Sequence, residues 1–196
     1  MITINEITIV VDGREIIYDY SEQIPAGSIT AIVGPNGSGK STLLAAIAGD
    51  IAPTKGTITI DGLHPILTAP AQLAQIRAVA IQNQSYTLGF TVQQIIEMAG
   101  PAEEVMRSLE LTPLANRVVT TLSGGEAQRV SIAAAIAQKT PVLLLDEPLA
   151  AQDVSSRKRI IEVLKKLAED GVSVVVVAHS SESELTWADK VIKQLL

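Results

Sequence analysis

The 196-residue chain contains no cysteine, which excludes disulfide bonds and thiolate metal sites and fits a reducing compartment. Only 3% of its residues are aromatic, although 47% are hydrophobic. Its core must therefore be built from Ala, Val, Ile and Leu. The length is enough for one domain with a full core, with or without a small insertion.

Long apolar runs and excess basic charge are also missing. The most apolar run is VSVVVVA at 172–178, far short of the roughly 20 residues that a membrane-spanning helix needs. The N-terminal stretch MITINEITIVVDGREI alternates and carries charge, which is not the pattern of a signal peptide. The net charge of −6 argues against a nucleic-acid partner, because such proteins present a basic face.

What the chain does contain is an alternation of strand and helix patterns. Residues 2–10 and 57–60 alternate like half-buried strands. Three near-continuous apolar runs, at 28–34, 142–146 and 172–179, are typical of strands covered on both faces in a parallel sheet. Helical patterns follow at 40–48, before Gly49, and at 155–170, before Gly171. This order predicts an α/β fold.

The middle of the chain has a different pattern. Residues 85–117 contain no buried-strand run, and Thr91 with Gln94 fits a capping box at a helix start. The following stretch PAEEVMRSLEL opens with proline and acidic residues, which are favoured in a first helical turn. We therefore predict a helical subdomain at 85–117, inserted into a core formed by 1–84 and 118–196.

A phosphate-binding loop is predicted by GPNGSGKS at 34–41, which fits G-x-x-x-x-G-K-[ST] between a buried strand and a helix. Its backbone N–H groups would face phosphate oxygens, Lys40 would reach the terminal phosphates, and Ser41 would place a hydroxyl on Mg²⁺. The predicted ATP-binding residues are Gly34, Pro35, Asn36, Gly37, Ser38, Gly39, Lys40, Ser41 and Thr42. A glycine-rich turn without a ligand is the alternative.

An acidic pair ends the apolar run VLLLDEP at 142–148. Asp146 would lie at the carboxyl edge of a buried strand, where α/β sheets bind ligands, and would hold Mg²⁺ directly or through water. Glu147 would then lie beside the γ-phosphate and act as general base on water. The alternative is an acidic strand end packed against a helix N-terminus.

A second candidate anion site is LSGGEAQR at 122–129. Ser123 and Glu126 fit a capping box, but Gly124 and Gly125 are poor helix formers in a first turn. Bare N–H groups at a helix N-terminus bind anions, which gives the glycines a reason to be there.

Together these motifs resemble the nucleotide-binding subunit of ABC transporters over nearly the whole chain. GPNGSGKST resembles its Walker A loop, VLLLDEP its Walker B, and LSGGEAQRV its signature, the most specific element. Gln82 matches the Q-loop glutamine, Asp153 in AAQD the D-loop aspartate, and His179 the switch histidine. The fold implied is a P-loop NTPase, with a RecA-like parallel-sheet core, an N-terminal antiparallel β subdomain and a small helical insertion.

The resemblance implies a head-to-tail homodimer in the ATP-bound state, with ATP between the Walker A loop of one copy and the signature of the other. It implies catalytic roles for Glu147, His179 and Gln82. Magnesium would be held by Ser41, Gln82 and Asp146, and the partner's ATP would be contacted by Ser123, Gly124, Gly125 and Glu126. It also implies an integral-membrane permease on a separate chain, and a cytoplasmic location on the inner face of the membrane.

The sequence departs from the family pattern at several positions. Val11 stands where an aromatic residue usually stacks on adenine, Ala134 where an arginine is common, and Ser180 where an aspartate follows the switch histidine. The D-loop reads AAQD where SALD is usual. Only 40 residues separate Gln82 from Ser123, so we expect a compact helical subdomain. We expect no additional C-terminal strands or regulatory domain after DKVIKQLL.

Three functions fit these motifs. The first is the ATPase of a prokaryotic importer, and YTLGFTVQQIIEMA after Gln82 resembles subunits for iron-chelate and cobalamin uptake. The second is a soluble mechanochemical ABC ATPase, which would carry coiled coils, paired cassettes or basic surfaces. The third is a P-loop small-molecule kinase, which leaves the signature, Gln82 and His179 unexplained.

Overall fold

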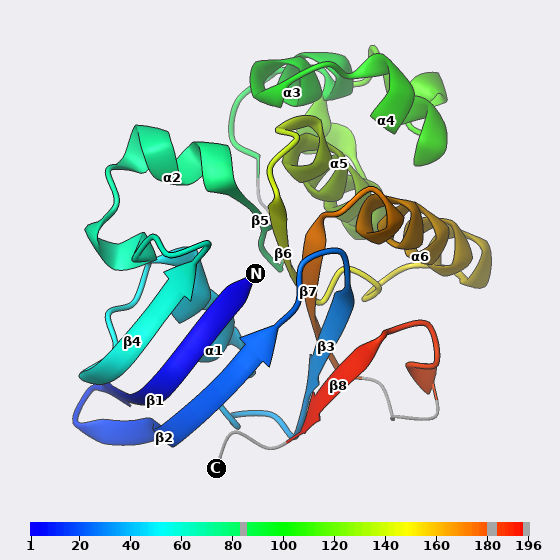
Figure 1. Ribbon diagram of the computed structural model, residues 1–196. Helices are drawn as coiled ribbons and strands as arrows, with labels where there is room; N and C mark the ends of the chain where they lie inside the picture. The colour runs from blue at the N-terminus through cyan, green and yellow to red at the C-terminus, as the bar shows by residue number, and fades with distance from the viewer. Residues whose placement is uncertain (83–85, 180–183, 194–196) are drawn as a thin grey trace.

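Two β-sheets of different kinds organise the chain in the computed structural model, which describes residues 1–82, 86–179 and 184–193 (Figure 1). The strands are β1 (Ile2–Val11), β2 (Arg14–Ile24), β3 (Ile29–Val33), β4 (Lys55–Ile60), β5 (Arg77–Ala80), β6 (Val142–Asp146), β7 (Ser173–Ala178) and β8 (Lys190–Lys193). The α-helices are α1 (Lys40–Ala48), α2 (Pro70–Ile76), α3 (Val92–Ala99), α4 (Glu103–Ser108), α5 (Gly124–Ala137) and α6 (Val154–Glu169), with short 3₁₀ turns at Pro65–Leu67, Thr112–Leu114 and Val119–Thr121.

The larger sheet is parallel and has the strand order β5-β6-β7-β3-β8. Every residue of β3 and β7 is buried, and successive side chains enter two different cores. Val174 and Val176 face one core, whereas Val175 and Val177 face the other. Apolar residues on both faces explain the continuous apolar runs, and the predicted α/β fold with a parallel sheet is confirmed.

The smaller sheet is antiparallel, with the order β2-β1-β4. Asp12 and Gly13 form the turn between β1 and β2, and both have positive φ, 50° and 75°, as a two-residue hairpin turn requires. Strand β2 was not among the predicted strands. The predicted N-terminal antiparallel subdomain is present, and β1 lies between β2 and β4 (Figure 1).

Helix α1 lies between the two sheets, in a core that also contains β1, β2, β4 and one face of the parallel sheet. Leu43, Leu44 and Ile47 are at most 3% exposed. A helix that is apolar around most of its circumference is buried on several sides, as this one is. Gly49 ends the helix with φ 86°, in the left-handed region expected of a C-terminal cap.

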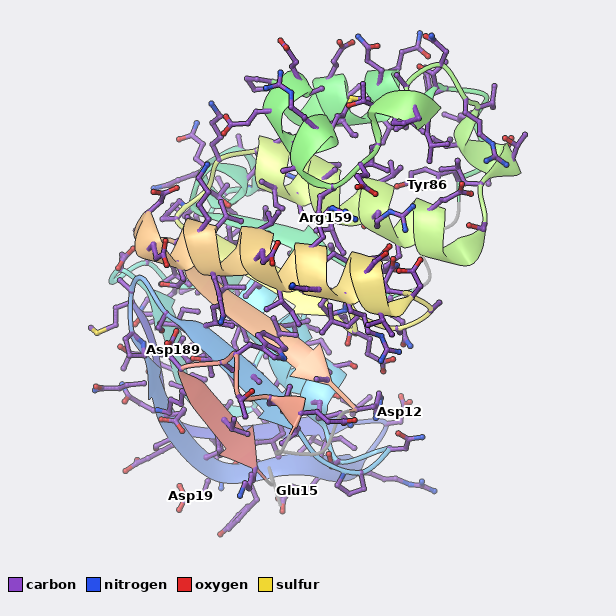
Figure 2. All side chains as sticks on the ribbon, turned by 90° about the vertical axis from the view of Figure 1, so that its right-hand side faces the viewer. Asp12, Glu15, Asp19, Tyr86, Arg159 and Asp189 are labelled. Carbon is purple, nitrogen blue, oxygen red and sulfur yellow. The ribbon has the colours of Figure 1, made fainter. Side chains whose placement is uncertain are left out.

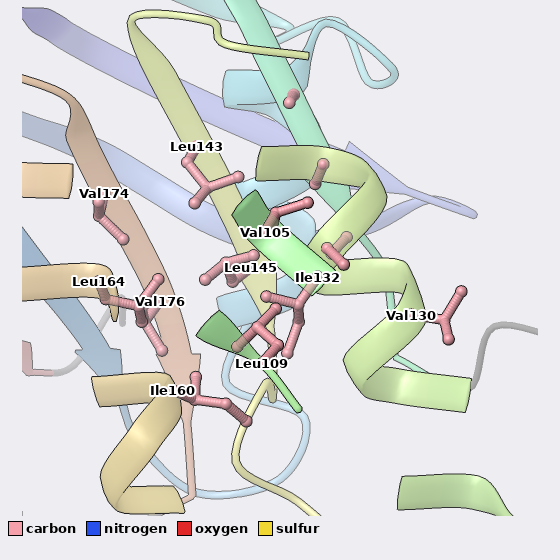
Figure 3. Close-up of a cluster of buried hydrophobic side chains, with 14 of the residues drawn as sticks. Val105, Leu109, Val130, Ile132, Leu143, Leu145, Ile160, Leu164, Val174 and Val176 are labelled. Carbon is pink, nitrogen blue, oxygen red and sulfur yellow. The ribbon is translucent and has the colours of Figure 1, made fainter. Parts of the chain in front are cut away.

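The opposite face of the parallel sheet is covered by α5 and α6, with α3 and α4 packed beyond α5 (Figure 1). Figure 3 shows Ile132 of α5 and Ile160 of α6 meeting Leu145 of β6 and Val176 of β7. Helix α3 begins at the predicted capping box of Thr91 and Gln94. Helices α3 and α4 lie within the predicted insertion at 85–117. The proposed boundary between residues 84 and 85 lies outside the described residues, as do Ser180 and residue 196.

Acidic side chains mark the outer edge of the antiparallel sheet. Figure 2 shows Asp12, Glu15 and Asp19 in the lower part of the view, below Tyr86 and Arg159, and the three acids are exposed. Among residues 1–82, 86–179 and 184–193, no helix is long and apolar enough to cross a membrane.

Candidate functional site

The predicted site residues meet at the carboxyl ends of four adjacent strands. The loop from Gly34 follows β3, Gln82 follows β5, Asp146 ends β6, and His179 follows β7. Since the order is β5-β6-β7-β3, these ends form one edge of the parallel sheet, where open α/β sheets bind ligands. A cleft of about 640 Å³ opens there. Its lining residues are Ile16, Asn36, Gly37, Gly39, Lys40, Ser41, Thr42, Gln82, Glu147 and His179.

The loop over α1 is closed around Lys40, which is only 4% exposed. Its ammonium donates to the carbonyl oxygens of Gly34 at 2.9 Å and Pro35 at 2.8 Å. An ammonium has three donors, so one remains for a phosphate oxygen. Gly39, at the N-cap, has φ 87°, and a Cβ there would lie 3.0 Å from the Ile16 side chain. Glycine is favoured at this position both by the left-handed conformation and by the little space for a side chain.

A buried hydroxyl supports a phosphate ligand in this loop. Ser38 is 5% exposed, and its Oγ has no hydrogen-bond partner among the described residues. Buried polar atoms in folded proteins nearly always have a partner, so this hydroxyl is one that a bound ligand or water would satisfy. A Cβ on Gly34 would lie only 2.7 Å from the same Oγ, so the loop is tightly wound there. The loop thus fits the triphosphate of a nucleotide.

The donor set for a magnesium ion lies beside this loop. Ser41 Oγ donates to Asp146 Oδ1 at 3.4 Å, which joins the start of α1 to the end of β6. Burial raises the pKa of Asp146 above its ordinary value and the Glu147 carboxylate also raises it, whereas the hydrogen bond from Ser41 opposes both. Within the described residues no group of three or more His, Cys, Asp or Glu side chains is placed to hold a metal. One carboxylate with a hydroxyl suits Mg²⁺, which takes its other ligands from phosphates and water.

Glu147 lies at the centre of the three predicted catalytic residues. Gln82 Nε2 donates to Glu147 Oε2 at 2.6 Å, and His179 Nε2 lies 2.5 Å from Glu147 Oε1. The Glu147 side chain is 14% exposed. Its backbone has a positive φ of 50°, and its N–H donates to the Val177 carbonyl at 3.0 Å. Both carboxylate oxygens are therefore oriented by side chains from neighbouring strand ends.

The signature segment forms the N-terminus of α5, and none of its residues is among those that line the cleft. Ser123 Oγ accepts from the Glu126 N–H at 3.3 Å, and Glu126 Oε2 accepts from the Ser123 N–H at 2.7 Å, so the predicted capping box is present. Arg117 pairs with Glu126 at 3.2 Å. These hydrogen bonds, with those from Ser123 first, lower the pKa of Glu126. Ser123 and Gly124 are exposed.

The two glycines of this segment have different surroundings. A Cβ on Gly124 would meet nothing within 4 Å, whereas a Cβ on Gly125 would lie 2.7 Å from the carbonyl oxygen of Ala151. Gly125 therefore allows close packing of α5 against the D-loop, which sequence reasoning did not anticipate. Asp153, the D-loop aspartate, caps α6 by accepting from the Ser156 N–H at 2.7 Å.

Two further residues at the site were not assigned roles from the sequence. Ile16 of β2 lines the cleft, whereas Val11, at the usual aromatic position, is not among the lining residues. Gln152 is 6% exposed and joins the D-loop to α5. The Asp12–Gly13 turn is the signal that would have placed Ile16 on a hairpin strand. For Gln152 the only signal was its departure from the usual D-loop sequence.

The fold and the site define the chain as a P-loop nucleotide-binding protein with a second, exposed helix N-terminus. The family model described as "ABC transporter" matches residues 17–150. The chain therefore belongs to the ABC transporter family, and it is an ATPase cassette of that family. The kinase alternative is excluded.

Relatives with curated names include import subunits. The hemin import ATP-binding protein HmuV of Nocardia farcinica is 39% identical, over 91% of this chain and 67% of its own length. The cobalamin import ATP-binding protein BtuD of Halobacterium salinarum is 38% identical, over 92% of this chain and 49% of its own length. The chain thus spans about two thirds of the first relative's length and about half of the second's.

Among solved structures, the bacterial ABC transporter cassette MJ0796, described as dimeric, superposes with a TM-score of 0.85. It is 29% identical, and the match covers 99% of this chain and 94% of that one. The match agrees with the predicted P-loop fold over the whole described chain.

Proposed function

We propose that this chain is the ATP-hydrolysing subunit of an importer, driving uptake of a hemin-, iron-chelate- or cobalamin-type substrate. The names of the curated relatives support the substrate class. They do not favour the alternative of a mechanochemical ATPase uncoupled from transport. The observation that carries the hydrolytic function is the position of Glu147, which Gln82 and His179 hold beside the phosphate-binding loop.

The loop would bind the nucleotide before any partner arrives. Backbone N–H groups at the start of α1 and the remaining donor of Lys40 would neutralise phosphate charge, which is the main requirement of phosphoryl transfer. Ser41, Asp146 and Gln82 would hold Mg²⁺. When bound, the ion supplies charge neutralisation between the phosphates.

Glu147 would act as general base and accept a proton from the attacking water. Gln82 orients one of its oxygens and His179 the other, so the carboxylate has little rotational freedom. His179 would also contact the γ-phosphate once the nucleotide is in place. Neither role requires a large movement, because both side chains already lie at the same sheet edge.

A second copy of the chain would complete the site. Ser123, Gly124 and Gly125 of one copy would face the γ-phosphate held by the other, and Glu126 would keep this helix start formed. ATP binding then favours the closed head-to-tail dimer, and loss of the γ-phosphate favours opening. This closure would drive a membrane-spanning permease on a separate chain, with the cassette on the inner, cytoplasmic face of the membrane.

The proposal is tested by co-purifying the chain with its permease and reconstituting the complex in lipid vesicles. We expect hemin or cobalamin to raise ATP turnover. Transport should fail with Glu147→Gln, because general base catalysis contributes about 10²–10⁴-fold, while ATP binding remains. That variant should also accumulate as an ATP-bound dimer in size-exclusion chromatography. Turnover at the wild-type rate in Glu147→Gln would show that Glu147 is not the base.

A further inference from the structure

The residue Gln152 forms a buried polar link between the D-loop and α5. Its Nε2 donates to the Gly125 carbonyl oxygen at 3.0 Å, and its Oε1 accepts from Arg129 at 3.2 Å. The side chain therefore uses both ends of its amide on the helix that carries the signature. Gln152 is only 6% exposed, so these hydrogen bonds are largely shielded from water. Losing either one would therefore leave a buried polar group without a partner, which is energetically unfavourable.

Gln152 is also held by α6 through its backbone. Arg157 Nε donates to the Gln152 carbonyl oxygen at 3.0 Å. On the other side, Arg129 donates to Ser156 Oγ at 3.2 Å as well as to Gln152. Gln152 thus has hydrogen bonds to both α5 and α6 close to their N-termini.

The loop that Gln152 anchors begins at the catalytic carboxylate. Glu147 and Ala151 both have positive φ, 50° and 54°, although neither is glycine. Such conformations cost free energy and persist only where the surroundings enforce them. Two contacts hold Ala151 against α5. Its carbonyl oxygen lies close to Gly125, and the neighbouring Gln152 amide donates to the Gly125 carbonyl oxygen. Only four residues, 148–151, separate Gln152 from Glu147.

We propose that Gln152 is a positioning residue that couples the signature segment to Glu147 of the same chain. The proposal rests on the proposed function, in which the signature contacts the partner's ATP. When that ATP draws in the start of α5, the Gly125 carbonyl moves with it, and Gln152 passes the displacement to the loop that sets Glu147. Each ATP of the dimer would in this way influence hydrolysis of the other.

Two variants separate this role from simple packing. Gln152→Leu keeps a similar volume and removes both side-chain hydrogen bonds. Gln152→Glu keeps an acceptor for Arg129, with charge, but removes the donor to the Gly125 carbonyl. Gln75→Leu, at an exposed glutamine of α2, is the matched control. For each purified chain, ATP turnover is measured against ATP concentration, together with the melting temperature and the affinity of the monomer for a fluorescent ADP analogue.

We expect both Gln152 variants to lower kcat about tenfold, the effect of one buried hydrogen bond, and to reduce the Hill coefficient for ATP towards 1. Monomer nucleotide affinity should stay within about twofold of wild type, and Gln75→Leu should match wild type. Because Gln152→Glu can still pair with Arg129, a folded but uncoupled chain is expected even if Gln152→Leu unfolds.

The proposal would be overturned if Gln152→Glu kept the kcat and the Hill coefficient of the unmodified chain. It would also be overturned if the unmodified chain showed no cooperativity in ATP. A fall in melting temperature without the kinetic change would show that Gln152 has only a structural role. These results are distinct from failure of the proposed function, which would appear as a Glu147→Gln chain that stays monomeric with ATP.

Discussion

The starts of α1 and α5 use the same physical principle in opposite ways. Both present backbone N–H groups where an anion can bind. The α1 start is enclosed: Lys40 and Ser38 are at most 5% exposed, and Gly39 provides no side-chain cap. The α5 start is exposed, and the capping box of Ser123 and Glu126 already provides hydrogen-bond acceptors for some of its backbone N–H groups. We therefore propose that the α1 start binds a phosphate within one chain, whereas the α5 start needs another surface to cover it.

The substitution Ser123→Arg should have the largest effect on the α5 start. A long charged side chain at the exposed start should block approach of a second copy, and turnover should fall by about 10²–10³-fold, as when preorganised charge stabilisation is lost. Nucleotide affinity of the monomer should be unchanged, because Ser123 is not among the residues lining the cleft. Steady-state ATPase and equilibrium binding measure the two quantities. Unchanged turnover would contradict a shared site.

The complementary change is Lys40→Met, which keeps most of the side-chain volume. Loss of a charge-assisted contact with phosphate should weaken nucleotide binding to the monomer by roughly tenfold to a hundredfold. Isothermal titration of the monomer with ATP and Mg²⁺ measures it, with the melting temperature as the control for folding. If affinity is retained, Lys40 does not contact the phosphates.

The two glycines of the α5 start give a matched pair. Gly125→Ala should destabilise the fold by about 1–3 kcal/mol, because its Cβ would lie 2.7 Å from the Ala151 carbonyl oxygen. Gly124→Ala, with open space around the new Cβ, should be neutral or stabilising by up to about 1 kcal/mol. Chemical denaturation of both variants checks the difference. Equal stabilities would mean that the close approach to the D-loop is not rigid.

The smallest expected effect concerns the capping box. The lowered pKa of Glu126 means that its carboxylate stabilises the fold above its ordinary pKa of 4.5, and that this contribution is lost as the pH falls towards the lower folded-state value. The melting temperatures of wild type and Glu126→Gln should therefore differ most near pH 7 and converge at acidic pH. A difference that grows on acidification would have the wrong sign.

Short motifs predicted where several candidate site residues lie, whereas some elements of the fold left no local signal in the sequence. Motifs at strand ends and helix starts predicted the positions of Lys40, Asp146 and Glu147, and they also predicted the α5 capping box. These features depend on residues that are close together in the sequence. The short strand β5, RAVA at 77–80, has no distinguishable period, and α2 lies outside the predicted helices. Their existence depends on neighbouring elements rather than on their own residues.

Gly124 and Gly125 also show that contacts between distant segments are not predicted from a local motif. Sequence reasoning gave Gly124 and Gly125 one purpose, anion binding, because each simply lacks a side chain. Only the fold brings the Ala151 carbonyl against Gly125, and only the fold connects the buried amide of Gln152 to that peptide. Contacts between segments distant in sequence cannot be derived from local spacing.

We infer that each ATP site is built from two chains, and mixing two inactive variants provides a direct test of this arrangement. Lys40→Met lacks a working phosphate loop but keeps its signature, whereas Ser123→Arg has the reverse defect. Their heterodimer contains one complete site. We predict that an equimolar mixture hydrolyses ATP well above the sum of the separate variants. A mixture no more active than that sum would contradict the shared site.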